Sequence, residues 1–471
     1  MRSSKKYFED QAFTGKTNRR AKSYYWNAII EYCKYFIYEE SSVLEVGCGT
    51  GDLLQRIGGG RKVGIDFSKE MIRQAREKYS EVEFHEMSCE LLELEEKFDV
   101  IILSNLIGYL DDIEQGLYEL NKVCHPNTKI IITYYNYLWE PILKFAEWVG
   151  VKQKTPPQNW LSQVDINNLL QLAGFDVYRT TRQMLIPINI PGLSWIFNKY
   201  LAKIPLLNYF CINTFTFASP RSSLDATEVE DRYSVSIVIP ARNESGNIED
   251  AILRIPKFGK SVEIIFIEGN STDDTWDKIQ EIATKYADTH NIKIDRQDGK
   301  GKGDAVRKGY QMATGDILMI LDADLTVRPE DLPKFYNAIA SGKGEFINGS
   351  RLVYTMEKQA MRFLNILGNK FFSALFTWLL DQPFKDTLCG TKVLFRKDYD
   401  RIKVNRTFFG EFDPFGDFDL IFGAHKLNLK IVELPIRYQE RTYGETNISR
   451  FKHGFILLKM CFFAARKIKF R

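Results

Sequence analysis

The stretch Gly315-Asp-Ile-Leu-Met-Ile-Leu-Asp-Ala-Asp-Leu325 joins a short apolar run to two acidic residues. The apolar residues Ile317 to Leu321 predict a β-strand that is buried on both faces. Asp322 and Asp324 follow one residue apart, and side chains at i and i+2 of a strand point to the same side. Open α/β sheets bind ligands at the carboxyl ends of their strands. The two carboxylates therefore predict a site for Mg²⁺ or Mn²⁺, which prefer oxygen ligands and can hold a diphosphate.

The composition is that of an ordinary globular protein, with 44% hydrophobic and 27% charged residues among 471. This length predicts two or three domains. The net charge of +3 argues against a dedicated nucleic-acid-binding protein. The seven cysteines are scattered without a C-x-x-C pair, which indicates a reducing compartment and neither disulfides nor zinc. The sequence shows no apolar signal segment and no run of about 20 apolar residues, so we expect a cytoplasmic protein without a spanning helix.

The first half of the chain contains a strand that leads into a glycine-rich turn, Val43-Leu-Glu-Val-Gly-Cys-Gly-Thr-Gly51. Glycines there allow positive φ and a close approach of a ligand to the backbone. The next predicted strand, Lys62 to Asp66, ends in an acid that can accept hydrogen bonds from ribose hydroxyls. Strands and helices continue to alternate up to Tyr135, which predicts a doubly wound sheet. A G-x-G turn alone would also suit a dinucleotide.

The form Glu-Val-Gly-Cys-Gly-Thr-Gly resembles motif I of class I S-adenosylmethionine-dependent methyltransferases, and the likeness extends over roughly residues 40–180. It implies a Rossmann-like fold with S-adenosylmethionine as cofactor. The cofactor-binding residues that it implies are Glu45, Gly47, Gly49, Gly51, Asp66, Ser88 and Asn105. A catalytic base for methylation cannot be identified, since His85 and His125 suit structural roles better. The absence of an Asn-Pro-Pro-Tyr pattern disfavours nucleic-acid substrates.

The segment from about 184 to 225 is apolar, aromatic and broken by prolines. It either packs between domains, which we favour slightly, or lies on a membrane surface. Residues 211–218 alternate like a terminal antiparallel strand, and the polar stretch after them is the best candidate boundary. We therefore expect one domain at residues 1–225 and a second at 226–471.

The second half begins a new α/β unit with the predicted strand Val235 to Ile239. A second strand ends at Glu268, where a cluster of helix N-cap residues follows. The glycine- and lysine-rich stretch Gly299 to Arg307 suits diphosphate oxygens, because lysines and backbone N–H groups bind them well. Its spacing excludes a P-loop.

Together with the Asp322-Ala-Asp324 strand, these segments resemble family-2 glycosyltransferases of the GT-A fold. More specifically, they resemble the polyprenol-phosphate (dolichol-phosphate) sugar transferase branch, over nearly all of residues 233–450. The resemblance implies a metal held by Asp322 and Asp324 and a GDP- or UDP-sugar donor. The donor-binding residues that it implies are Pro240, Arg242, Glu244, Glu268, Asp273, Lys302, Asp304 and Arg351.

The sequence departs from this branch at two places. Glu268-Gly-Asn-Ser271 replaces the usual Asp-Asp-Gly-Ser, which leaves guanine or uracil open as the base. Thr446-Asn447 replaces Ser-Lys and removes a cation from the expected acceptor-phosphate pocket. The expected catalytic residues are Asp322, Asp324, Asp386, Asp417 and Arg441, with Asp419 as a further candidate base.

Two aromatic amphipathic stretches, 363–380 and 454–471, suit helices at an anionic membrane surface. Core packing and dimerisation are their alternatives. The sequence thus predicts two doubly wound α/β domains in a bifunctional enzyme at the inner face of the cell membrane. This enzyme would transfer a sugar to a polyprenyl-phosphate or glycan acceptor and methylate the same product. In one rival hypothesis the first domain is a non-catalytic cofactor-binding or scaffold module, and in another the second domain is a nucleotide-sugar sensor.

Overall fold

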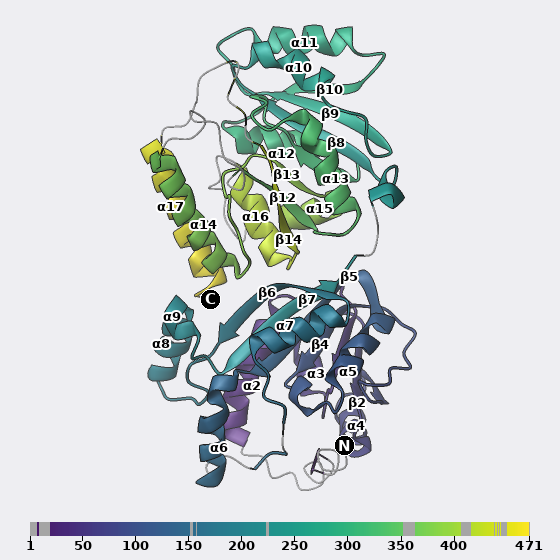
Figure 1. Cartoon of the computed structure of the whole chain (residues 1–471), viewed down its shortest axis with the longest axis vertical. Helices are drawn as coiled ribbons and strands as arrows, with labels where there is room; N and C mark the ends of the chain where they lie inside the picture. Colours follow the sequence, from purple (N-terminus) through teal and green to yellow (C-terminus); the bar gives the residue numbers. More distant parts are fainter. Residues whose placement is uncertain are drawn as a thin grey trace. The chain divides into compact units, whose positions relative to one another are not determined.

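The structure is a computed structural model that describes residues 7–8, 19–150, 154–156, 158–222, 226–351, 363–406, 416–437, 439, 441, 443 and 450–470. The chain forms two compact units that divide between Arg221 and Ser222. Each unit contains a seven-stranded sheet with helices on both faces (Figure 1). This confirms the predicted class of two doubly wound α/β domains. The expected domain ranges 1–225 and 226–471 stay predictions, and Thr446 and Asn447 lie outside the described residues.

The first unit has the strand order β3-β2-β1-β4-β5-β7-β6. Its strands are β1 (Val43–Val46), β2 (Lys62–Asp66), β3 (Glu83–Glu86), β4 (Phe98–Ser104), β5 (Cys124–Tyr135), β6 (Phe175–Gln183) and β7 (Asn213–Pro220). Its helices are α2 (Arg19–Lys34), α3 (Asp52–Arg56), α4 (Lys69–Lys78), α5 (Ile113–Glu119), α6 (Glu140–Trp148), α7 (Gln163–Leu172), α8 (Leu193–Lys199) and α9 (Pro205–Asn208).

Alternating side chains of these strands fill two separate cores. Val43 and Ile102 belong to the core on one face of the sheet, while Leu44 and Ile101 belong to the core on the other. This alternation follows from the two-residue period of a strand. β7 pairs antiparallel with both β5 and β6. The predicted antiparallel strand at residues 211–218 therefore exists, and it lies inside the sheet of the first unit.

The second unit has the strand order β10-β9-β8-β11-β13-β12-β14. Its strands are β8 (Ser234–Ala241), β9 (Ser261–Glu268), β10 (Asn291–Arg296), β11 (Ile317–Ile320), β12 (Phe346–Ser350), β13 (Lys392–Phe395) and β14 (Ile431–Pro435). Its helices are α10 (Ile248–Leu253), α11 (Thr275–Lys285), α12 (Lys302–Met312), α13 (Leu332–Ala340), α14 (Phe363–Leu380), α15 (Arg396–Val404), α16 (Asp417–Lys426) and α17 (Arg450–Ile468).

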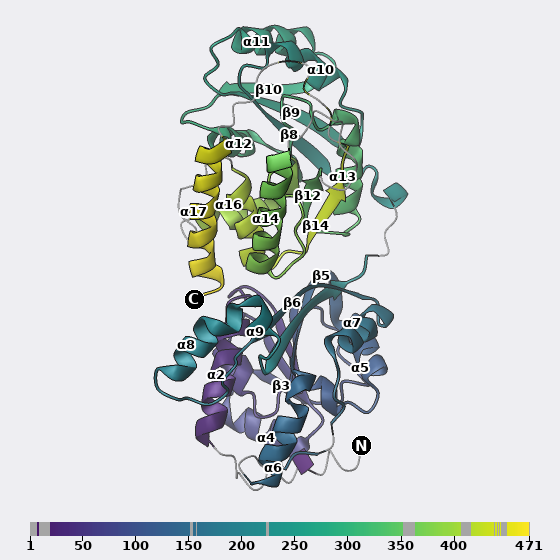
Figure 2. The ribbon, with the colours of Figure 1, turned by 60° about the vertical axis from the view of Figure 1, so that its left-hand side comes forward.

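The buried strand β11 occupies the centre of the second sheet, between the parallel neighbour β8 and the antiparallel neighbour β13. All four of its residues are buried, as the apolar run predicts. α14 and α17 lie side by side in both views (Figure 2). Among the helices of the described ranges, none is both long and apolar enough to cross a membrane.

Both sheets reverse their strand order at an equivalent point. In the first sheet the order turns between β1 and β4, and in the second between β8 and β11. Ligands of open α/β sheets bind at such switch points, outside the carboxyl ends of the strands. The topology thus singles out one place in each unit for a site.

Candidate active sites

A cavity of about 210 Å³ lies at the carboxyl ends of β1 to β4 in the first unit. Of the predicted cofactor residues, Gly47, Asp66 and Ser88 line it. Aromatic and apolar residues that no sequence motif indicates also line it, namely Phe67, Leu106, Tyr109 and Leu110. Glu45, Gly49, Gly51 and Asn105 are not among its lining residues.

The glycine turn after β1 is tied to the acid at the end of β2. Gly47, Gly49 and Gly51 have φ angles of 75°, 52° and 77°, which other residues adopt only with strain. Asp66 accepts hydrogen bonds from the backbone N–H groups of Gly49 and Ser68, both at 2.9 Å. Burial raises the pKa of Asp66, although these two donors act in the opposite direction. The turn is therefore fixed beside the cavity by the residue predicted to hold a ribose.

Glu45 lies in β1 and is only 3% exposed. Burial, reinforced by the charge of Asp66, raises its pKa well above the ordinary value. Its Oε2 atom has no hydrogen-bond partner among the described residues. Buried polar atoms in native proteins are normally paired, and the role of Glu45 in cofactor binding stays a prediction.

Asn105 follows β4 with a φ of 52° and joins a polar cluster. Its Nδ2 donates to the Tyr25 hydroxyl at 3.1 Å, and that hydroxyl donates to Asn213 Oδ1 at 2.7 Å. Tyr25 comes from α2 and Asn213 from β7, so no local sequence signal links these residues. His85 pairs with Glu83 at 2.7 Å and His125 with Asp99 at 3.1 Å. Neither histidine lines the cavity.

The second site is a set of ion pairs at the carboxyl ends of β8 and β11. Lys302 Nζ, at the start of α12, lies 2.5 Å from Asp322 Oδ1. Arg441 contacts two acids, Asp324 at 2.6 Å and Glu244 at 3.2 Å. The structure thus brings together five predicted site residues from four separate segments of the sequence.

Burial and charge act against each other on these groups. Burial alone would raise the pKa of Asp322, but the charge and hydrogen bond of Lys302, together with the charges of Lys392 and Arg351, outweigh it and lower this pKa. Burial would likewise lower the pKa of Lys302, and the charges of Asp322 and Asp417 raise it instead. For Glu244 burial dominates and raises the pKa to about 7, against the opposing charge of Arg441.

Asp322 and Asp324 do not belong to the strand itself. β11 ends at Ile320, and a turn follows in which Leu325 has a φ of 51°. Asp324 Oδ1 accepts hydrogen bonds from the backbone and hydroxyl of Thr326, at 3.1 and 2.8 Å. The i, i+2 argument from strand geometry therefore does not apply to this pair, because the turn sets their directions.

The other predicted donor-binding residues have internal partners. Glu268 accepts from the Ser271 backbone at 2.5 Å, and Asp273 from the Thr275 hydroxyl at 2.5 Å. Asp304 accepts from the Gly299 backbone at 2.7 Å. Pro240 lies in β8, and Arg242 follows that strand. These contacts fix the loops at the carboxyl ends of the strands, and the ligand roles of all five residues stay predictions.

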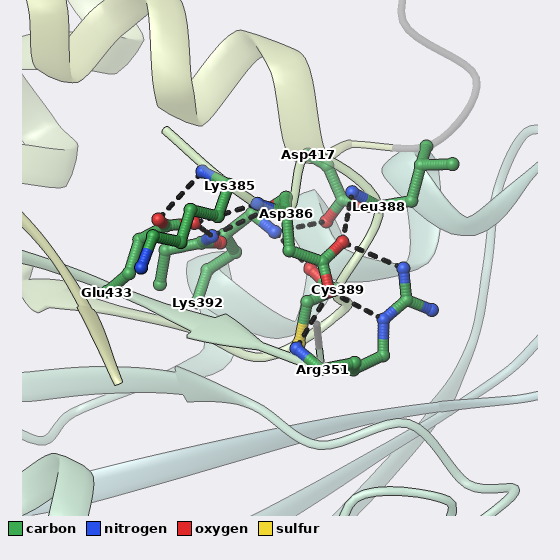
Figure 3. A network of polar contacts seen from close by, with 9 residues as sticks. Arg351, Lys385, Asp386, Leu388, Cys389, Lys392, Asp417 and Glu433 are labelled. Carbon is green, nitrogen blue, oxygen red and sulfur yellow. Dashed lines mark hydrogen bonds and ion pairs between the residues drawn. The ribbon is translucent and has the colours of Figure 1, made fainter. Parts of the chain in front are cut away.

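Arg351 and Asp386 form a buried pair instead of an open catalytic group (Figure 3). The guanidinium binds both carboxylate oxygens, at 2.7 and 2.8 Å, and Asp386 is fully buried. Burial opposes ionisation, but the charge and hydrogen bonds of Arg351, together with the charge of Lys392, outweigh it and lower the pKa of Asp386. The role of Asp386 as a catalytic base stays a prediction, and in this structure its carboxylate is enclosed and paired with Arg351.

The same network contains buried groups that the sequence analysis did not single out. Lys392 is fully buried, and its Nζ donates to the carbonyl oxygen of Cys389. It also lies 3.8 Å from Asp417, at the first turn of α16. Glu433 accepts hydrogen bonds from the backbone N–H groups of Lys385 and Asp386, at 2.7 and 2.9 Å (Figure 3). Burial and ion pairing thus leave Asp417 poorly placed to act as a base.

Comparison with known families assigns both units. Residues 37–182 match the family described as Methyltransferase domain, and residues 236–402 match Glycosyl transferase family 2. The chain carries a methyltransferase domain and a family-2 glycosyltransferase domain. Both resemblances predicted from the sequence are confirmed.

Named relatives agree with the assignment of the glycosyltransferase domain. The chain is 31% identical to a dolichol-phosphate mannosyltransferase of Pyrococcus furiosus, over 45% of this chain and 59% of the relative. It is 30% identical to a low-salt glycan biosynthesis hexosyltransferase of Haloferax volcanii, over 47% of this chain and 51% of the relative. The chain thus spans between half and three-fifths of the length of these relatives. A solved S-adenosylmethionine-dependent methyltransferase from Aquifex aeolicus aligns at 18% identity and a TM-score of 0.32, over 45% of this chain and 97% of that chain.

The glycosyltransferase domain can supply few ligands to a metal ion. Among the described residues, no three acidic, histidine or cysteine side chains come together in a way that could hold one. Asp322 and Asp324, one residue apart in the chain, are the two carboxylates predicted to hold it. Mg²⁺ is commonly held by one or two carboxylates, with water and substrate phosphates as the other ligands. The residues present therefore fit a metal that arrives together with a diphosphate.

Proposed function

We propose that this chain is a bifunctional enzyme. Its second domain would transfer a sugar from a GDP- or UDP-sugar to a polyprenyl-phosphate or glycan acceptor. Its first domain would methylate the same glycan or glycolipid, with S-adenosylmethionine as the methyl donor. The proposal rests chiefly on the paired acids and cations at the switch point of the second sheet, in a domain whose family transfers sugars.

In sugar transfer, the bond between the anomeric carbon and the diphosphate breaks, and a bond from the acceptor oxygen to that carbon forms. The nucleoside diphosphate leaves with the electron pair, so negative charge develops on its oxygens. Lys302 and Arg441 are cations beside Asp322 and Asp324 and can stabilise that charge. A metal held by Asp322 and Asp324 would supply further positive charge to the diphosphate when bound.

A phosphate acceptor suits this domain better than a hydroxyl acceptor. A hydroxyl needs a base to accept its proton, whereas a phosphate is already anionic. Asp386 is fully buried, and Asp417 is 5% exposed. The Asp419 side chain is only 10% exposed and lies 3.7 Å from Arg307 and 3.6 Å from Arg406. Since all three candidate bases are buried or paired, we favour a polyprenyl phosphate, the class of acceptor named in the Pyrococcus relative.

In the methyltransferase domain, the cavity at the ends of β1 to β4 would hold S-adenosylmethionine. Asp66 would accept hydrogen bonds from the ribose, and the turn from Met87 to Ser88 would lie beside the adenine. Gly47 would allow the methionine end to approach the backbone. The fusion of the two domains motivates a shared substrate, because both reactions would then act on one sugar.

We further propose that the domains span residues 1–225 and 226–471 and that the enzyme acts at the inner face of the cell membrane. Phe455, Leu458 and Phe462 form an exposed stripe on α17, at 72%, 43% and 75% exposure. Their spacing places them on one face of the helix. Such a stripe suits peripheral contact with the membrane that carries a polyprenyl phosphate.

A thermal-shift panel on the whole protein tests both halves of the proposal. The ligands are S-adenosylhomocysteine, and UDP or GDP with Mn²⁺, singly and together. A ligand that binds only the folded state raises the melting temperature. We expect one shift with S-adenosylhomocysteine and another with a single nucleotide, which identifies the donor base. A nucleotide shift without a cofactor shift would indicate a scaffold role for the first domain. No nucleotide shift would contradict the sugar-transfer proposal.

A further inference from the structure

The α8–α9 surface is an exposed apolar area on the methyltransferase unit, formed by residues 188–210. Its most exposed large side chains include Leu206 at 79%, Phe210 at 60% and Trp195 at 55%. Tyr209 and Ile196 are 55% and 46% exposed. α8 and α9 lie next to each other at the margin of this unit in both views (Figures 1 and 2). Soluble monomers rarely expose a large continuous apolar area unless it binds something.

The polar side chains of this segment point inward and hold its backbone in place. Ser194 is 1% exposed, donates to the Ile188 carbonyl and accepts from the Ile190 N–H, at 2.7 and 2.9 Å. Asn208 donates to the carbonyl oxygens of Arg182 and Ala202, at 3.2 and 3.0 Å. These hydrogen bonds hold the segment in place while its apolar side chains face the solvent. The surface is therefore preformed.

The charges of this segment have a single sign. No aspartate or glutamate occurs between Asp176 and Asp225. Lys199 Nζ lies 5.6 Å from the centre of the Trp195 ring, and the Arg182 guanidinium lies 4.6 Å from the Tyr209 ring. Cations, together with aromatic rings that have a polar edge, favour the boundary between lipid headgroups and acyl chains.

Helix α6 of the same unit also exposes apolar residues, but acidic residues lie among them. It exposes Phe145 and Trp148, at 60% and 79%. It also carries Glu140 and Glu147 among those residues. An anionic surface would repel these carboxylates, which makes α8–α9 the better candidate for lipid contact.

We propose that the α8–α9 surface docks the methyltransferase unit onto an anionic lipid bilayer. Trp195, Leu206 and Phe210 insert into the interfacial region, and Lys199 faces the headgroups. The docking is separate from the contact proposed for α17 and does not depend on either transfer reaction. It would hold the methyltransferase unit at the surface where a lipid-linked substrate is found.

Vesicle co-sedimentation of the full chain tests the docking. The vesicles contain phosphatidylcholine alone or mixed with phosphatidylglycerol, and the variant is Trp195→Glu/Leu206→Glu. We expect partition onto the mixed vesicles to fall by roughly tenfold or more, because two apolar insertions are lost and two negative charges are added. The matched control is Val164→Glu/Leu172→Glu on α7, whose residues are 75% and 60% exposed outside this surface. The control should keep wild-type partition, and partition should weaken as salt is raised.

A fluorescent label gives a second measurement that does not depend on total binding. Six of the seven native cysteines are buried, so Leu206→Cys can be labelled selectively with an environment-sensitive dye. We expect a blue shift of its emission on mixed vesicles, and none for a label at Val164→Cys. Unchanged partition of the Trp195→Glu/Leu206→Glu variant, or no blue shift, would overturn the proposal. If the blue shift instead grows with protein concentration in the absence of vesicles, the surface binds a second copy of the chain, and the proposal is overturned.

The outcome can be separated from that of the proposed function. Binding of S-adenosylhomocysteine by the Trp195→Glu/Leu206→Glu variant, measured by calorimetry, should equal that of the wild type. Phe462→Glu on α17 changes the other expected lipid contact and should leave the blue shift at position 206 in place. Loss of the shift in the Phe462→Glu variant would show that α8–α9 does not dock by itself, which also contradicts the proposal.

Discussion

The two units place their sites at the same point of the same architecture but build them from different groups. In the methyltransferase domain, Asp66 accepts from the backbone N–H groups of Gly49 in the glycine turn and of Ser68, and a cavity is already open. In the glycosyltransferase domain, Asp322 and Asp324 are each bound to a cation of the chain. The first site is thus an open cavity beside a fixed turn, whereas the second holds balanced charges that the proposed diphosphate would have to rearrange.

This difference has a physical reason. A nucleoside diphosphate brings several negative charges, and a site of unpaired acids would repel it. In the proposed reaction, Lys302 and Arg441 would compensate the acids before the donor arrives and would then turn to its phosphates. The two sites should therefore respond differently to mutation, which the following predictions use.

The largest effect is expected from Asp324→Ala. The change removes a proposed metal ligand and one of the acids that pair with Arg441. We expect sugar transfer to fall by roughly a thousandfold, since stabilisation of developing charge is often the largest catalytic contribution. Transfer is measured with the nucleotide-sugar identified by the thermal-shift panel. Calorimetry with S-adenosylhomocysteine is the control, and loss of cofactor binding in the same variant would contradict two independent sites.

Gly390→Ala should disturb the same site without removing any charge. An added Cβ atom would collide with Asp322 Oδ2 and lie 2.6 Å from Lys302 Nζ, so the ion pair must move. Misplacement of reacting groups by about 1 Å can cost roughly a hundredfold in rate. We expect a loss of that order in sugar transfer. Gly368→Ala in α14, where an added Cβ meets nothing within 4 Å, is the matched control. Equal activities of the two variants would show that the Lys302–Asp322 geometry does not matter.

Gly49→Arg tests the backbone-built site of the methyltransferase domain. Gly49 has a φ of 52° and open space around its Cβ position, so a long side chain can enter the cofactor turn. We expect the affinity for S-adenosylhomocysteine to fall by roughly tenfold or more, since the left-handed backbone costs about 1–2 kcal/mol in addition to steric blockage. Sugar transfer should be unchanged. Gly150→Arg, also at positive φ in open space, should bind the cofactor normally. If both variants lose affinity equally, the effect arises from backbone strain elsewhere in the domain.

The architecture could be predicted well from the sequence, because local patterns indicate its strands and turns. The apolar run at β11, the glycine turn after β1 and the acid at the end of β2 are all short-range signals. The enclosure of Asp386 by Arg351 could not be predicted from the sequence, because burial depends on chain segments that are far apart in sequence. The hydrogen bond between Tyr25 and Asn213 could not be predicted for the same reason. The turn after β11 also removed the basis for treating Asp322 and Asp324 as strand residues.

The smallest effect is expected from the titration of Glu244. Burial raises its pKa from 4.5 to about 7 in the folded protein, so the folded state holds this proton more tightly than the unfolded state. The contribution of Glu244 to the free energy of unfolding is fully present below pH 4.5 and is lost as the pH rises towards 7. The change amounts to at most about 3 kcal/mol in the free energy of unfolding, and screening by nearby solvent reduces it.

The wild type should therefore lose stability relative to Glu244→Gln between these pH values, because glutamine does not titrate. Denaturant unfolding of both proteins across this range measures the difference, and all other titrating groups cancel in the comparison. The substitution leaves the methyltransferase domain unaltered, so the unfolding of that domain serves as an internal reference. A constant difference between the two proteins would mean that Arg441 keeps Glu244 ionised throughout, and that this acid is as fully compensated as Asp322.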